Sequence, residues 1–142
     1  MTHVTTSTRP ISEKEIDRSW HLVDAKGQTL GRIIPEITQK LQGKHKTSYV
    51  PYLDMGDNVV VINAAHVAVT GKKEDNKTYK YYSGYPGGLK EVSYKHMKQH
   101  KPEEIIRHAV SGMLPKNKHK DSRLARLFIY PDENNKQSKH FS

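Results

Sequence analysis

A continuous apolar run constrains the fold more than any other feature of the sequence. Asn58-Val-Val-Val-Ile-Asn63 is apolar without alternation, which is the pattern of a strand buried on both faces. A second short strand is predicted at Trp20-His-Leu-Val-Asp-Ala25, and the turn signal Lys26-Gly27 follows it. Between the two strands, apolar residues recur at helical spacing and Gly43 is suited to end a helix. This order predicts a right-handed parallel crossover in an α/β domain.

Pro35 complicates the predicted helix, whose apolar positions are Leu30, Ile33, Ile34, Ile37 and Leu41. Proline lacks the backbone N–H, and its ring fits only the first turn of a helix or a kink. We therefore expect the regular helix to begin close to Pro35, with residues 29–34 as a tighter lead-in.

The remaining elements follow from the same patterns. Residues 77–83 alternate like a strand that places Tyr79 and Tyr81 on one face. A weakly amphipathic helix is expected over 92–100, and the clearest helix of the chain starts at Pro102. A loop, a short helix and a last strand are expected over 116–130. We expect an N-terminal extension (1–19), one α/β domain (20–130) and a polar, loosely held C-terminal tail (131–142).

Positive charge is concentrated in two parts of the chain. The sequence has 24 Lys and Arg against 15 Asp and Glu in 142 residues, for a net charge of +9. Residues 72–101 hold eight lysines and three acids, and residues 107–126 hold six basic residues and one acid. Some basic runs are only solvated faces, but an excess this local favours a surface that contacts nucleic-acid phosphates.

Residues 79–90 combine four tyrosines, two lysines and several glycines around a turn. Tyrosine rings can stack on unpaired bases, and glycines allow close approach of the backbone to a polyanion. A structural alternative is a hairpin whose tyrosines pack on a sheet and whose glycines only turn the chain. A second candidate is the charged triplet Lys44-His-Lys46, which has no acid beside it in the sequence and is expected to contact phosphates.

Signals for other functions are weak. The chain has no cysteine, so disulfides and thiolate metal sites are excluded, and no apolar run reaches membrane-spanning length. Residues 69–73 contain Gly-Lys but not the rest of a phosphate-binding loop. His96 and His100 could hold zinc on one helix face, but lysines flank them and no further ligand is at the required spacing. For Asp54 and Asp57 we expect capping or turn roles.

Several ordered segments together resemble the universal large-subunit ribosomal protein of the thirteenth family, in its bacterial form. They are Trp20-His-Leu-Val-Asp-Ala25, Leu30-Gly-Arg32, Leu41-Gln-Gly-Lys-His-Lys46, Gly56-Asp-Asn-Val-Val-Val-Ile-Asn-Ala64, Val67-Ala-Val-Thr-Gly71, Tyr81-Tyr-Ser-Gly-Tyr-Pro-Gly-Gly88 and Ala109-Val-Ser-Gly-Met-Leu-Pro-Lys116, with a looser match over 123–130. The sequence departs from the family pattern at Pro35, in the lysine-rich segment 117–122 and in the C-terminal tail.

The resemblance implies a three-layer α/β/α single domain with a four-stranded, mostly parallel sheet, plus basic loops and extensions. It implies a cytoplasmic, non-enzymatic constituent of the large ribosomal subunit that binds large-subunit ribosomal RNA, supports early assembly and lies beside other large-subunit proteins. No cofactor, metal, membrane or small-molecule substrate is expected. The alternatives are a translational regulator that binds messenger RNA outside the ribosome and a nucleotide-dependent enzyme on the same fold.

The charged, tyrosine and glycine positions together define the expected RNA-binding residues. They are Arg32, Lys40, Lys44, His45, Lys46, Lys72, Lys73, Lys80, Tyr82, Ser83, Gly84, Tyr85, Gly87, Gly88, Lys90, Lys116, Lys118, His119, Lys120, Arg123 and Arg126.

Overall fold

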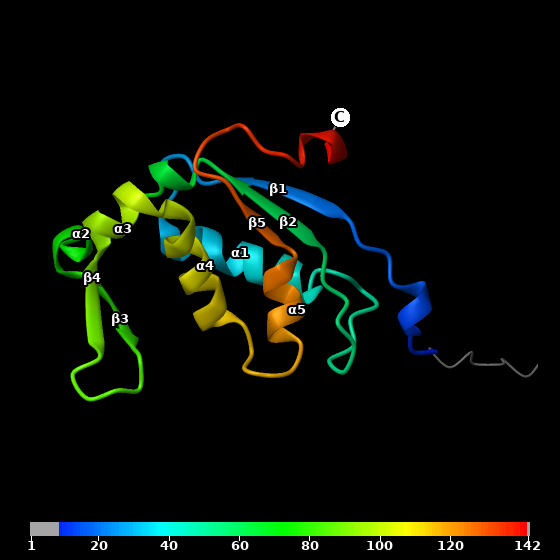
Figure 1. Ribbon diagram of the computed structural model, residues 1–142. Coiled ribbons are helices and arrows are strands. Elements are labelled where there is room, and N and C mark those ends of the chain that lie inside the picture. The colour runs from blue at the N-terminus through cyan, green and yellow to red at the C-terminus, as the bar shows by residue number, and fades with distance from the viewer. Residues whose placement is uncertain (1–8, 142) are drawn as a thin grey trace, which may run out of the picture.

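Three parallel strands form the centre of the structure, a computed structural model that describes residues 9–141 (Figure 1). Their order in the sheet is β1 (Trp20–Asp24), β2 (Asn58–Ile62) and β5 (Leu127–Ile129), with β2 between the other two. Val60 lies opposite Leu22 on one side and Phe128 on the other. The side chains of residues 59–61 are fully buried, so the apolar run forms the central strand, as predicted.

Two long helices supply most of the core opposite the sheet. α1 (Leu30–Gln42) connects β1 to β2, and α4 (Pro102–Met113) packs beside it. Figure 1 shows both helices, together with α5 (Lys120–Ala125), on the same side of the sheet. The apolar stripes of α1 and α4 point into this layer, where Ile37, Leu41, Ile105 and Ile106 are completely buried. The predicted strand, helix and strand crossover is confirmed.

α1 begins at Leu30, and Pro35 lies inside it, so the prediction of a helix starting near Pro35 is wrong. A proline in a helix interior costs roughly 3 kcal/mol. Burial of one large aliphatic side chain contributes about 1.5–3 kcal/mol, and α1 buries five of them: Leu30, Ile33, Ile34, Ile37 and Leu41. Packing therefore outweighs the local preference.

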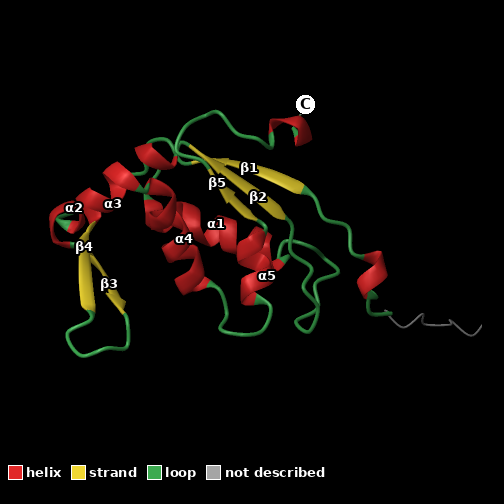
Figure 2. Cartoon of the chain, viewed as in Figure 1, coloured by secondary structure: helices red, strands yellow, loops and turns green. Residues whose placement is uncertain are grey.

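The segment between β2 and α4 forms a hairpin that extends away from the sheet (Figure 2). It begins with η2 (Ala64–His66) and α2 (Lys73–Asn76), continues through the antiparallel strands β3 (Thr78–Tyr82) and β4 (Leu89–Ser93), and ends in α3 (Tyr94–His100). The strand over 77–83 is confirmed. The helix expected over 92–100 starts only at Tyr94, because Val92 and Ser93 pair with β3 and the Ser93 side chain accepts a hydrogen bond from the His96 N–H.

The four-stranded sheet and the three-layer arrangement are not confirmed. The apolar segment 67–69 makes a single parallel bridge, between Ala68 and Thr29, rather than a fourth strand. On the sheet face opposite the helices, the Trp20 ring stacks on Phe128 and on His140 of η3 (Ser138–His140). The chain is thus a small mixed α/β domain with a three-stranded parallel sheet and an antiparallel pair.

Both terminal segments are attached to the domain. The Asn63 N–H donates to the Asp132 carbonyl at 3.2 Å, and the His140 ring stacks on Trp20, so the C-terminal tail contacts the domain at two points of its described part. Residues 1–8 of the expected extension lie outside the described residues. After η1 (Glu13–Glu15), Arg18 donates to the Gly56 and Asp54 carbonyls at 2.7 and 3.1 Å. No helix within residues 9–141 is long and apolar enough to cross a membrane.

The loop between α1 and β2 packs closely against the end of α1. At Gly56, an added Cβ would overlap the carbonyl of Leu41 and would lie 2.9 Å from the Arg126 guanidinium. At Gly43, where φ is +78°, a Cβ would lie 2.5 Å from the Met55 carbonyl oxygen. The two glycines therefore allow this loop to lie directly on the helix end.

We expect Gly56→Ala to lower the free energy of unfolding by about 1–3 kcal/mol or more, because backbone atoms have to move to admit the methyl group. Gly112→Ala in α4 is the matched control, since its Cβ meets no atom within 4 Å and alanine is favoured in helices by up to about 1 kcal/mol. Urea denaturation at 25 °C measures both variants. Equal stability of the two variants would contradict the close packing of the loop.

Candidate nucleic-acid interface

Three loops from distant parts of the sequence extend to the same side of the molecule. Figure 1 shows the tip of the β3–β4 hairpin, the loop between α4 and α5, and the loop between α1 and β2 all pointing away from the sheet and from the C-terminal segment. These loops carry residues 83–88, 114–119 and 43–57. We call this side the three-loop face. Most of the expected RNA-binding residues lie on it or on the elements that lead to it.

The hairpin tip exposes aromatic rings on a tight turn. Tyr82 and Tyr85 are 69% and 74% exposed, whereas Tyr79 at the base of the hairpin is buried. Gly84 and Gly87 have φ values of +85° and +71°, and the Gly88 N–H donates to the Tyr85 carbonyl at 2.9 Å. The hairpin of the structural alternative is therefore present, but its outer tyrosines do not pack on a sheet.

Tyr79 anchors the base of the hairpin to α4. Its ring meets the His108 ring edge to face, with centroids 5.1 Å apart. Burial raises the pKa of the Tyr79 hydroxyl to about 12. The sequence prediction that Tyr79 and Tyr81 share a face agrees with their pairing with Val92 and Lys90, but only Tyr79 reaches the core.

The lysines of the hairpin differ in their partners. Lys80 forms an exposed ion pair with Glu91 across the two strands, at 3.2 Å. Lys90 is exposed and forms no ion pair within the described part of the chain. Ser83 lies at the start of the tip, and its backbone N–H donates to the Gly88 carbonyl.

The basic segment 116–126 divides into an exposed and a buried part. Lys116 and Lys118 are exposed in the loop before α5, and His119 and Lys120 are half-buried where the helix begins. In contrast, Arg123 is only 2% exposed. The expectation that Arg123 belongs to the binding surface is therefore wrong, because the side chain is directed into the protein.

Asp54 explains the buried part of this segment. Its carboxylate accepts two hydrogen bonds from Arg126, each of 2.7 Å, and one from the Arg123 Nε at 3.3 Å. Burial alone raises the pKa of Asp54, but the hydrogen bonds and charges of Arg126 and Arg123 outweigh it and the pKa is lowered. Arg126 also donates to the Leu41 carbonyl, so its charge is largely used within the protein.

Asp57 likewise pairs with basic side chains of the triplet Lys44-His-Lys46 after α1. Its buried carboxylate lies 2.6 Å from the Lys46 Nζ and 2.9 Å from the His45 Nε2. No acid lies beside this triplet in the sequence, but in the fold Asp57 pairs with Lys46 and contacts His45. Within the triplet, only Lys44 forms no ion pair with a residue of 9–141. Roles limited to capping or turns are also wrong for Asp54 and Asp57, because both carboxylates are centres of ion pairs.

His21 on β1 completes the group around Asp57, with its Nε2 2.7 Å from the same carboxylate oxygen as His45. The Ser19 N–H donates to the other oxygen. Burial raises the pKa of Asp57, but the bonds from Lys46, His21 and Ser19 lower it further than burial raises it. His21, His45 and Asp57 are close enough to share a metal ion, but the ammonium of Lys46 beside the carboxylate opposes a dication.

The remaining expected residues lie away from the loop tips. Lys40 pairs with Glu36 on α1 at 2.5 Å. Arg32, Lys72 and Lys73 are exposed near the start of α1 and the base of the hairpin. Sequence reasoning did not single out the exposed side chains of Tyr52 and Leu89, which lie in no periodic pattern, and it assigned Met113 to the buried stripe of α4, although this side chain is exposed.

A small α/β domain whose exposed cations and tyrosines gather on loops at one side is typical of proteins that bind folded nucleic acid. The model of the family described as Ribosomal protein L13 matches residues 18–136. The large ribosomal subunit protein uL13 of Clostridioides difficile is 53% identical over 116 residues, which cover 82% of this chain and 81% of the relative. The uL13 proteins of Caldanaerobacter subterraneus and Psychrobacter are 53% and 47% identical, over 82% and 87% of this chain and 81% and 87% of their own. The chain belongs to the ribosomal protein L13 family.

We expect Asp57→Asn to cost about 3 kcal/mol at neutral pH, at the lower end of the values for breaking a buried ion pair because Lys46, His21 and His45 are partly exposed. The folded-state pKa of Asp57 is lowered, so its contribution is present above the unfolded value near 4 and is lost as the pH falls through the folded-state pKa. The stability difference between wild type and variant should shrink as the pH falls below about 4. Urea denaturation across this range measures it, and a constant difference would contradict the charge interaction.

Proposed function

We propose that this chain is a structural, non-enzymatic constituent of the large ribosomal subunit that binds large-subunit ribosomal RNA through the three-loop face. Membership of the ribosomal protein L13 family supports the ribosomal assignment. The single observation that carries the RNA contact is the gathering of exposed tyrosines and unpaired lysines on loops of one side. The protein then acts in the cytoplasm, beside other proteins of the subunit, and supports its assembly.

Two kinds of contact hold RNA on this face. Lys44, Lys90, Lys116 and Lys118 neutralise phosphates, because none of them is engaged in an ion pair with a described residue. The rings of Tyr82 and Tyr85 stack on unpaired bases or riboses, and Gly84 and Gly87, beside which no atom lies within 4 Å of an added Cβ, admit the backbone close to the RNA. Gly88 instead makes room for the Ser83 side chain within the turn. Lys80, His119, Lys120 and Ser83 contribute from the same elements, and Arg32, Lys40, Lys72 and Lys73 extend the contact along α1 and α2.

Shape rather than base sequence dominates this recognition. In folded RNA the deep major groove hides most base edges from side chains. A face built of three separate loops recognises the spacing between RNA backbones. The ion pairs of Asp54 and Asp57 keep one of these loops in place.

Sedimentation tests the assignment. A tagged copy of the chain should co-sediment with large subunits in stoichiometric amount and remain there through a wash that removes loosely bound proteins. Recovery mainly with messenger RNA, away from the subunits, would instead favour the translational regulator. Turnover of a nucleotide by the free chain would favour the enzyme.

Tyr85→Ala should weaken binding to purified large-subunit ribosomal RNA by about 1–3 kcal/mol, which is roughly 5-fold to 150-fold in affinity. Its unfolding free energy should change by less than about 0.5 kcal/mol, because the ring is exposed. Tyr79→Ala is the contrasting variant and should cost about 3–5 kcal/mol of stability. Filter binding and urea denaturation on the same samples separate the two effects. Unchanged affinity in Tyr85→Ala would remove the hairpin tip from the interface.

Replacing Lys116 and Lys118 together by Ala should flatten the salt dependence of RNA binding. For every phosphate that is no longer neutralised, the slope of log K against log[salt] becomes shallower by about 0.7–0.9. Lys26→Ala with Lys136→Ala removes the same charge from exposed positions outside the three loops and should leave the slope unchanged. Equal slopes in both double variants would show that binding depends on net charge and not on this face.

A further inference from the structure

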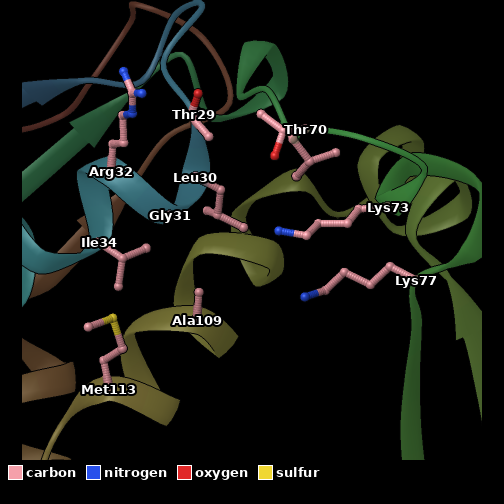
Figure 3. A pocket seen from close by; sticks show the side chains of 11 residues that line it. Thr29, Leu30, Gly31, Arg32, Ile34, Thr70, Lys73, Lys77, Ala109 and Met113 are labelled. Atoms are coloured by element: carbon pink, nitrogen blue, oxygen red, sulfur yellow. The ribbon is translucent and has the colours of Figure 1, made fainter.

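A cavity lies at the base of the hairpin, beside the three-loop face. It has a volume of about 380 Å³ and is lined by the first turn of α1, the end of α4, the segment 69–70 and residues of the hairpin base (Figure 3). Its size falls within the range of cavities that hold a small organic ligand.

One wall of the cavity is cationic. Figure 3 shows the ammonium groups of Lys73 and Lys77 extending from the hairpin base toward α1 and α4. The acids of α2 do not neutralise them, because Glu74 pairs with Lys98 and Asp75 pairs with Lys95 on α3. No acidic residue in the described part of the chain lines the cavity. The wall is therefore suited to an anion.

The opposite wall is apolar. Leu30 and Ile34 of α1 and Ala109 and Met113 of α4 form it, with Val69 beside them. Met113 is 53% exposed although Ile105, Ile106 and Val110 of the same stripe are buried, so its flexible thioether is free to pack on a ligand. An inorganic anion alone would make no favourable contact with this apolar wall.

Gly31 leaves space at the edge of the cavity. This residue lies in the first turn of α1 at an ordinary negative φ, and a Cβ there would meet no atom within 4 Å. The backbone can therefore carry a large side chain at this position, and such a side chain would lie at the edge of the cavity that Gly31 lines.

From the two unlike walls we propose that the cavity binds a single unpaired nucleotide of the RNA, with its phosphate on Lys73 and Lys77 and its base against Met113 and Ala109. A phosphorylated nucleoside is the unit of RNA that presents a compact anion and a flat apolar face together. The proposal rests on the proposed function. It adds a pocket for one nucleotide next to the three-loop face, which otherwise recognises the shape of the RNA. Lys77 connects the pocket to this face, because it directly precedes β3 of the hairpin.

Nuclear magnetic resonance on the full chain tests the pocket itself. Adenosine 5′-monophosphate should shift the Met113 methyl signal and the Gly31 and Thr70 amide signals saturably, and inorganic phosphate or adenosine alone should bind at least about tenfold more weakly. Lys73→Ala with Lys77→Ala should weaken nucleotide binding about tenfold or more, since both ammonium groups that hold the phosphate are removed. Lys26→Ala with Lys136→Ala should bind as wild type does.

Gly31→Leu fills the cavity and should abolish the Met113 shift, whereas Gly31→Ala should retain it. Urea denaturation of both variants confirms that they are folded. Absence of a saturable shift at Met113 in wild type, or equal affinity in the double lysine variant, overturns the proposal.

Crosslinking tests the RNA as the source of the nucleotide. In subunits that contain the chain with photoreactive methionine, Met113 should crosslink to one ribosomal RNA nucleotide, and Gly31→Leu should remove the crosslink. Met55 and Met97 are buried and serve as internal controls. Co-sedimentation without a Met113 crosslink overturns this proposal and leaves the proposed function standing. Binding of free nucleotide by a chain that does not enter subunits overturns both.

Discussion

Two carboxylates, the fully buried Asp57 and the half-buried Asp54, hold together a strongly basic part of the fold. Asp54 joins the loop after α1 to Arg123 and Arg126 of the α5 region, and Asp57 joins the same loop to His21 on β1 and to Lys46. Arg18 fastens the N-terminal segment to the carbonyls of the same loop. A like-charged set of side chains can pack together here only because each cation meets a carboxylate or a carbonyl.

This pairing also decides which cations are available to a partner. The sequence places an equal excess of charge in segments 72–101 and 107–126, but the structure uses the two excesses differently. In the second segment Arg123 and Arg126 are paired internally and the lysines before α5 remain exposed. This division matches the chemistry of the two side chains, because the planar guanidinium forms bidentate bonds to a half-buried carboxylate and the strongly hydrated ammonium is favoured in solvent.

The elements that can be predicted from sequence are those in which burial and local pattern agree. The apolar run of β2 and the stripe of α4 are both recognisable, since a strand buried on two faces and a helix buried on one leave distinct periods. Pro35 leads to a wrong helix start, because the sequence shows the preference of proline against a helix interior but not the packing of α1 that outweighs it. The partners of Asp54 and Asp57 lie up to 72 residues away, so nothing in the spacing of the two acids reveals them. Tyr82 and Tyr85 can be recognised as candidates from their residue type. Only the geometry of the hairpin shows that these two are exposed and that Tyr79 is buried.

The hairpin has weak apolar support, because only its base contacts the core. A two-stranded hairpin has little stability of its own in water. Here Tyr79 and Val92 anchor its base, together with Tyr94 and Met97 of α3, which pack into the core. Toward the tip these apolar contacts end, and Leu89 joins Tyr82 and Tyr85 in solvent. A sequence selected only for folding gains nothing from exposing three large apolar side chains at the end of an extended arm. The proposed contact with RNA accounts for this exposure, because it would cover the rings at the tip and neutralise Lys90, which has no ion pair in the described residues.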